Sequence, residues 1–84
     1  MRSYFITFRS VTFAQRGESV LRKGGIDCSL RRTPKWMEEQ GCGYSLHLHH
    51  GEVWAAMEQL RKHQISFRKV YVRLPNGETE EVKL

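Results

Sequence analysis

A helix bracketed by its own start and stop signals is the feature that most restricts the fold. In residues 11–23, apolar side chains recur at roughly helical spacing, and polar or charged residues fill the other side. Ser10 offers an N-cap, and a Gly-Gly pair offers a C-cap directly after the basic pair Arg22-Lys23. The pattern therefore predicts an α-helix over residues 11–23, around which the other segments must be placed.

Strand patterns flank this helix. Residues 4–8 are aromatic and β-branched, which suits a central strand. Residues 26–32 and 43–49 alternate apolar and polar side chains, as half-buried strands do. We expect the following side chains to face inward: Ile26, Cys28, Leu30, Tyr44, Leu46 and Leu48. We expect these to face outward: Asp27, Ser29, Arg31, Ser45, His47 and His49.

A second helix and a hairpin complete the chain. Residues 51–63 carry one apolar stripe at helical spacing, formed by Val53, Trp54, Met57 and Leu60. Residues 65–74 alternate like a strand, and the Asn-Gly in residues 75–78 suits a tight hairpin turn. Residues 79–84 can then return as a short, charged edge strand.

The order of these segments predicts an α+β fold. It is a ferredoxin-like β-α-β-β-α-β sandwich in which two helices cover one face of a four-stranded antiparallel sheet of order 4-1-3-2. A C-terminal β-hairpin extension is added to it. We expect a single domain over residues 1–84. No apolar run reaches the length of a membrane span and no secretory signal opens the chain, so we expect a cytoplasmic protein.

The chain is basic, with a formal charge of +5 from fourteen Lys and Arg against nine Asp and Glu. Such a charge favours an anionic partner such as RNA or an acidic protein surface. The basic residues are scattered along the chain rather than run together, which favours a solvated basic surface over a dedicated nucleic-acid face.

Cys42 stands out among the residues that could carry chemistry. It lies between Gly41 and Gly43, after the longest irregular connection in the chain, and long ordered loops are often functional. Cys28 instead belongs to an inward-facing strand pattern and is expected to act as a small buried hydrophobe. No CxxC pair is present, and the pattern does not argue for a disulfide.

Taken in order, these segments match a known domain pattern. It comprises the aromatic opening strand, a helix ending in Gly-Gly-Ile, a strand, a proline, Cys42-Gly43 opening an alternating strand, a second helix with Ala56-Met57-Glu58-Gln59-Leu60, and a strand through Tyr71. The chain resembles the small bacterial domains of the selenium/sulfur carrier protein-like family over about residues 4–71. The hairpin in residues 72–84 lies outside the resemblance. Residues 35–41 are bulkier and more acidic than the polar, serine-containing run usual in that family.

The resemblance implies that Cys42 carries sulfur or selenium, as a persulfide-type cargo, from a desulfurase-like donor protein to an acceptor protein. Gly41, Gly43 and Tyr44 would support the loop. A carrier needs a thiolate, and nearby positive charge or N–H donors favour one. His47, His49, Lys35 and the N–H groups of Gly43 and Tyr44 are candidates for that role. This describes a carrier better than an enzyme, and no cofactor is expected.

Three other interpretations stay open from the residues alone. Cys42, His47 and His49 could ligate a metal, although their spacing matches no structural zinc pattern. The open sheet face could bind RNA through Phe5, Phe67 and Tyr71, although the aromatic signature of RNA-recognition motifs is missing from residues 43–48. The basic residues expected around that face are Arg9, Arg31, Arg68 and Arg73. Two copies of the chain could also pair through the same aromatics as a homodimer.

Overall fold

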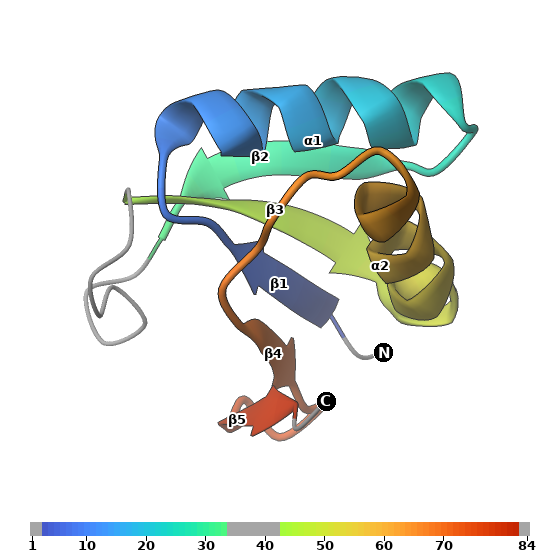
Figure 1. The fold of residues 1–84 in the computed structure, drawn as a ribbon. Helices are drawn as coiled ribbons and strands as arrows, with labels where there is room; N and C mark the ends of the chain where they lie inside the picture. Colours follow the sequence, from blue (N-terminus) through green and yellow to red (C-terminus); the bar gives the residue numbers. More distant parts are fainter. Residues whose placement is uncertain (1–2, 34–42, 83–84) are drawn as a thin grey trace.

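The structure is a computed structural model that describes residues 3–33 and 43–82, apart from the side chain of His50. Figure 1 shows two helices packed against a twisted sheet. The elements, in chain order, are β1 (Ser3–Thr7), α1 (Val11–Lys23), β2 (Cys28–Arg32), β3 (Tyr44–His49), the 3-10 turn η2 (His50–Glu52), α2 (Val53–Lys62), β4 (Val70–Arg73) and β5 (Thr79–Val82).

The sheet is antiparallel and has five strands in the order β2-β3-β1-β4-β5. The predicted α+β class with two helices on an antiparallel sheet is confirmed, and the predicted four-stranded ferredoxin-like layout is matched in part. The difference lies in β5, which pairs with β4 from Val70↔Val82 to Arg73↔Thr79 and so extends the sheet. Gly77, at φ +90°, allows the tight turn between these two strands.

Helix α1 begins and ends where its local signals predict. The Ser10 hydroxyl accepts a hydrogen bond from the backbone N–H of Phe13 at 3.2 Å. At the other end Gly25 lies at φ +82°, and the N–H of Ile26 reaches back to the carbonyl of Leu21 at 2.9 Å. This is the Schellman arrangement, which needs one left-handed residue after the helix.

Helix α2 ends in the same arrangement with a different residue. The N–H of Ile65 bonds the carbonyl of Leu60 at 2.8 Å, and the left-handed position falls on Gln64 at φ 60°. The beginning of the predicted helix over residues 51–63 is wrong in detail, because its first turn is the 3-10 turn η2. Gln64, which has a Cβ, is held after α2 in a left-handed conformation that glycine adopts more readily.

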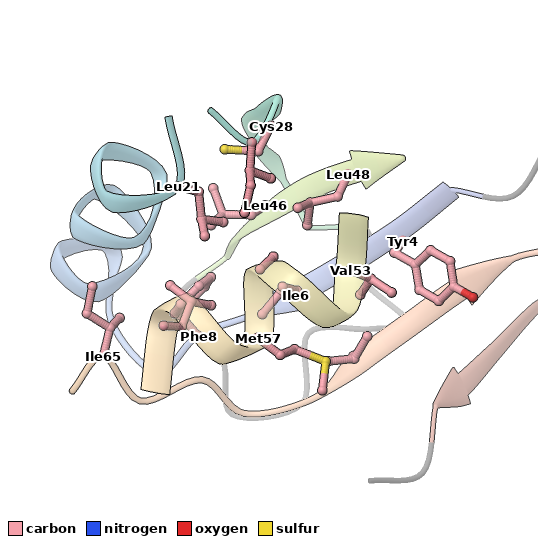
Figure 2. Close-up of a cluster of buried hydrophobic side chains, with 14 of the residues drawn as sticks. Tyr4, Ile6, Phe8, Leu21, Cys28, Leu46, Leu48, Val53, Met57 and Ile65 are labelled. Carbon is pink, nitrogen blue, oxygen red and sulfur yellow. The ribbon is translucent and has the colours of Figure 1, made fainter. Parts of the chain in front are cut away.

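The hydrophobic core lies between the helices and one face of the sheet (Figure 2). Strands β1, β3 and β4 supply Tyr4, Ile6, Leu46, Leu48 and Val70, and the helices supply Ala14, Leu21, Val53, Ala56, Met57 and Leu60. The prediction that Trp54 belongs to the buried stripe is wrong, since it is 61% exposed. The inward face of α2 follows Val53, Ala56, Met57 and Leu60, and the next residue after Val53 is rotated about 100° away from it.

The last predicted strand is shorter than expected, because β4 begins at Val70 rather than at residue 65. The segment before it is held to β1 by backbone bonds from Thr7 N to Lys69 O at 2.9 Å and from Arg68 N to Thr7 O at 2.8 Å. Among the described residues, no helix is long and apolar enough to cross a membrane.

Candidate functional site

The two cysteines of the chain lie in different settings, and the structure describes only Cys28. Its residue is 4% exposed, and its thiol lies 4.0 Å from the backbone carbonyl oxygen of Glu18. Figure 2 shows Cys28 at one margin of the buried cluster, on the same side as Leu21 and Leu46. Burial raises the pKa of the Cys28 thiol above 9.0, and the negative charge of Glu18 adds to that effect.

A thiol in this state is a poor nucleophile. The thiolate is the reactive form, and both burial and a neighbouring carboxylate disfavour it. The prediction that Cys28 serves as a small buried hydrophobe is confirmed by its place in the core. Cargo chemistry at sulfur therefore has no suitable residue in the described part of the chain.

Three predicted site residues, Cys42, Gly41 and Lys35, lie outside the described residues. The two residues that border this segment are described. The N–H of Thr33 donates to the carbonyl oxygen of Gly43 at 2.8 Å, so a backbone bond just beyond β2 and β3 joins the two residues that border segment 34–42. Gly43 itself lies at φ +84°, a conformation that side chains with a Cβ rarely adopt.

Tyr44 begins β3 directly after Gly43. Its side chain is half-buried, and the guanidinium of Arg32 lies 5.9 Å from its ring centroid. Arg32 and Tyr44 are also paired in the register of β2 and β3. A cation over an aromatic ring is an attractive contact, so the side chains at this end of the hairpin hold each other in place.

Two hydroxyl groups near the same end are buried without a hydrogen-bond partner among the described residues. They are Thr33 Oγ1 and Ser45 Oγ. Ser45 lies on the outward face of the sheet, as predicted, but it is fully buried there rather than exposed to solvent. In the register of the sheet Ser45 lies between Thr7 and Arg31, and these larger neighbours on both sides cover its short side chain.

His47 and His49 lie on the sheet face away from the helices, as predicted. The ring of His47 stacks on Phe5 with centroids 4.5 Å apart and an interplanar angle of 24°. Burial lowers the pKa of His47 below 6.5, and Arg31, His49 and Arg73 lower it further. His47 is therefore neutral at pH 7. His49 is exposed, and its Nε2 lies 3.8 Å from Oδ2 of Asp27.

The distances along β3 bear on the role predicted for these histidines. At about 3.3 Å per residue, His47 lies roughly 13 Å and His49 roughly 20 Å along the strand from Gly43. The N–H groups of Gly43 and Tyr44 are closer in the chain to position 42 than either imidazole. Activation of Cys42 by His47, His49 or Lys35 stays a prediction.

Of the three ligands predicted for the alternative metal site, two lie among the described residues. His47 and His49 are described, whereas Cys42 lies outside the described residues. Within residues 3–33 and 43–82, no three His, Cys, Asp or Glu side chains come together as a set that could hold a metal ion. Any metal set built on these histidines would have to draw on other residues.

The aromatic face proposed for RNA is smaller than expected. Phe5 and Tyr71 lie together on the open face, yet they are only 6% and 8% exposed. The guanidinium of Arg73 lies 5.4 Å from the Phe5 centroid and covers that ring from one side. The placement of Phe67 on this face is wrong, because Phe67 precedes β4 and packs against the helix-side core near Arg61. Bases stack on exposed aromatic rings, and the rings of Phe5 and Tyr71 are buried.

Comparison with known proteins adds the family. Searches of curated proteins and of solved structures gave no significant match. A family model described as "Putative Se/S carrier protein-like" matches residues 3–72, which includes every described element up to β4. The resemblance predicted over about residues 4–71 is thereby confirmed. The chain belongs to the putative Se/S carrier protein-like family.

Proposed function

We propose that this protein carries a terminal sulfur or selenium atom on Cys42 and passes it from a donor protein to an acceptor protein. The family name supports a carrier of sulfur or selenium. The observation that carries the assignment to a residue is the burial of Cys28, which is 4% exposed with a raised thiol pKa. Of the two cysteines in the chain, this leaves Cys42 for cargo chemistry.

The transfer is an exchange at sulfur and needs no outside oxidant. The Cys42 thiolate attacks the terminal sulfur of a donor persulfide, a new S–S bond forms on Cys42, and the donor's cysteine thiolate leaves. In delivery, a nucleophile of the acceptor attacks the same terminal sulfur, and the Cys42 thiolate leaves. A selenium atom would follow the same sequence, with an S–Se bond in place of the S–S bond.

Loading requires that Cys42 be a thiolate during attack, so its pKa should be lowered. The N–H groups of Gly43 and Tyr44 are the candidates nearest in the chain, and His47, His49 and Lys35 are candidates that would act through positive charge. His47 is neutral at pH 7 because burial and the arginines around it lower its pKa.

The proposed setting is the cytoplasm, where cysteines are kept reduced and a thiol carrier can be reloaded. The proposed partners are a desulfurase-like donor and an acceptor protein, between which the domain acts as a carrier rather than as an enzyme.

The test is intact mass spectrometry after incubation with a cysteine desulfurase and cysteine. Three proteins are compared: the native chain, Cys42→Ser and Cys28→Ser. We expect one added sulfur on the native chain and on Cys28→Ser, removable by dithiothreitol, and none on Cys42→Ser. The same incubation with a selenocysteine lyase and selenocysteine distinguishes the two cargoes. Equal loading of Cys42→Ser and Cys28→Ser, or no loading of the native chain by either donor, would overturn the proposal.

A further inference from the structure

A second feature lies at the other end of the β2–β3 hairpin from segment 34–42. It is a hollow of about 300 Å³ between the start of β2 and the end of β3. Its polar lining comes from Arg22, Asp27, Ser29, Arg31, His47 and His49. Its nearest lining residue on β3 is His47, about 13 Å along the strand from Gly43, the residue that follows Cys42.

The guanidinium of Arg31 supplies hydrogen-bond donors to this hollow. Its Nε donates a hydrogen bond to the hydroxyl oxygen of Ser29 at 3.1 Å, a contact between two residues that face the same side of β2. This bond orients the guanidinium and leaves its terminal N–H groups without a partner among the described residues. A planar guanidinium fixed in this way presents paired donors, which match the geometry of phosphate and carboxylate oxygens.

His47 lies directly across from Ser29 in the register of β2 and β3. Its ring is fixed by the stack on Phe5, and its nitrogens have no hydrogen-bond partner in the described part of the chain. Two guanidinium groups lie near it, Arg31 on β2 and Arg73 on β4, and neither has an ion-pair partner among the described residues. Arg73 also lies over Phe5, the other ring of the stack. Both guanidinium groups disfavour the protonated ring, so this part of the surface carries an excess of positive charge.

The acidic groups nearby have partners other than Arg31, and Glu52 accepts a hydrogen bond from the backbone N–H of Asp27 at 3.1 Å. Asp27 lies 3.8 Å from His49, and Glu18 lies 3.4 Å from Arg22. Arg22 also donates to the carbonyl oxygen of Cys28 at 3.0 Å, so its charge is held at the rim. Neither carboxylate neutralises Arg31. An anion in the hollow would therefore meet a donor set that the protein itself leaves unused.

We propose that this hollow binds a phosphate-type oxyanion, held by the guanidinium of Arg31 and by His47. The volume is at the lower end for small-ligand sites, which suits a single oxyanion group. The group could belong to free phosphate or to the phosphodiester of a single-stranded RNA, since both present the same oxygens. The site does not use Cys42 and stands apart from the carrier chemistry.

Binding and protonation of His47 are linked. An anion beside the imidazole favours its charged form, so the ligand raises the pKa of His47, and protonation in turn tightens binding. The charged and titratable groups around the ring are Arg31 on β2, whose Nε is bonded to Ser29, together with His49 on β3 and Arg73 on β4. Sulfate is the better probe of this linkage because its charge does not change between pH 5 and 8.

The experiment follows the histidine ring signals by NMR during titration with inorganic phosphate and with sulfate at constant ionic strength. The probes are added to the native chain, to Arg31→Gln and to Arg16→Gln. Arg16 is an exposed helix residue that does not line the hollow, so its variant controls for the loss of one charge. We expect a saturable shift of His47 but not of His63, a rise in the His47 pKa with sulfate, and at least a tenfold weaker affinity only in Arg31→Gln.

A short oligouridylate gives the second arm and separates the two sources of the oxyanion. Saturable binding of the oligonucleotide alone, lost in Arg31→Gln and kept in Arg16→Gln, supports the site with a phosphodiester as its ligand. The site is overturned if none of the three probes shifts His47, or if Arg31→Gln and Arg16→Gln bind equally. Repeating the titration in Cys42→Ser keeps the outcome independent of sulfur loading, and an unchanged amide spectrum of Arg31→Gln shows that the variant folds.

Discussion

The carboxylate of Glu18 on α1 accepts a hydrogen bond from the backbone N–H of Leu30, with Oε2 and N 3.2 Å apart. Leu30 belongs to β2, the edge strand of the sheet, and no strand among residues 3–33 and 43–82 pairs with its outer N–H and C=O groups. Arg22, one helical turn after Glu18, donates to the carbonyl oxygen of Cys28 on the same outer edge. Two side chains of α1 thus satisfy backbone groups that would otherwise invite pairing with another chain.

This contact predicts a specific loss of stability in Glu18→Ala. Removing the acceptor leaves the half-buried Leu30 N–H unpaired, and we expect the free energy of unfolding to fall by about 1 kcal/mol in urea denaturation. Glu18→Gln keeps an oxygen acceptor and should recover most of the loss. Glu58→Ala, at an exposed position on α2, is the control, and an equal loss there would contradict the role of the contact.

The conformation of Gln64 predicts that a glycine at this position would stabilise the protein. Gln64 occupies the left-handed position after α2 at φ 60°, where Gly25 stands in the same arrangement after α1. Gln64→Gly should raise the free energy of unfolding by about 0.5–1 kcal/mol, since glycine adopts this conformation without a Cβ clash. Thermal and urea unfolding measure the change. Lys62→Gly, two residues earlier at the last helical position of α2, should lower stability instead, and a loss in Gln64→Gly would refute the assignment of strain.

Gly17 predicts a steric limit between the two helices. A Cβ at this position would lie 3.2 Å from Leu60 Cδ2 and from Phe8 Cζ, with Leu46 Cδ1 at 3.3 Å. Gly17→Val should therefore overpack the core and cost about 1–3 kcal/mol of unfolding free energy. Gly51→Val is the matched control, because nothing lies within 4 Å of its added Cβ. Equal unfolding midpoints for the two variants would contradict the close packing.

His47 predicts a pH dependence of stability. Its pKa in the folded protein is lowered below 6.5, mainly by burial and then by Arg31, His49 and Arg73. Between the folded and the unfolded pKa, the unfolded chain binds more protons, so stability rises with pH through this window. The contribution of His47 to stability is fully present above pH 6.5. It is lost as the pH falls through the pKa that His47 has in the folded protein. His47→Gln should flatten the fall in urea midpoint between pH 7.5 and 5, and an undiminished slope would count against it.

Cys28 predicts a difference in reactivity. In a Cys42→Ser background its thiol should react with iodoacetamide only when the protein unfolds, because it is 4% exposed and its pKa is raised. We expect labelling at pH 8 to be at least a hundredfold slower than in urea-unfolded chain, with mass spectrometry as the measurement. Rapid labelling of the folded protein would remove the reason for assigning the cargo to Cys42.

The parts of the fold that local signals specify were predictable. Ser10 and the Gly-Gly pair determine both ends of α1 through hydrogen bonds only a few residues long, and the alternation in β2 assigns Cys28 to the core correctly. Trp54 and Phe67 were misplaced, and the burial of Ser45 was missed, for a different reason. Periodicity indicates the side of an element on which a residue lies, whereas its burial depends on neighbours brought in by the tertiary register.

The candidate site divides in the same way. The order of segments was sufficient to identify the family, whereas the choice of Cys42, made from its flanking glycines, stays a prediction. The oxyanion hollow depends on Ser29 lying opposite His47 and on Arg73 arriving from β4, which are long-range pairings. Strand alternation combined with the predicted strand order would have placed Arg31 and His47 on one face, and that combination is the signal that could have found them.

The fifth strand has a consequence for how the domain meets other chains. The family match ends at residue 72, inside β4, and β5 lies beyond it along the free side of that strand. A four-stranded version of this sheet would offer the β4 edge to any extended peptide, a common way for one protein to recruit another. Here β5 (Thr79–Val82) already pairs with the β4 edge. A partner chain must therefore bind elsewhere or displace β5.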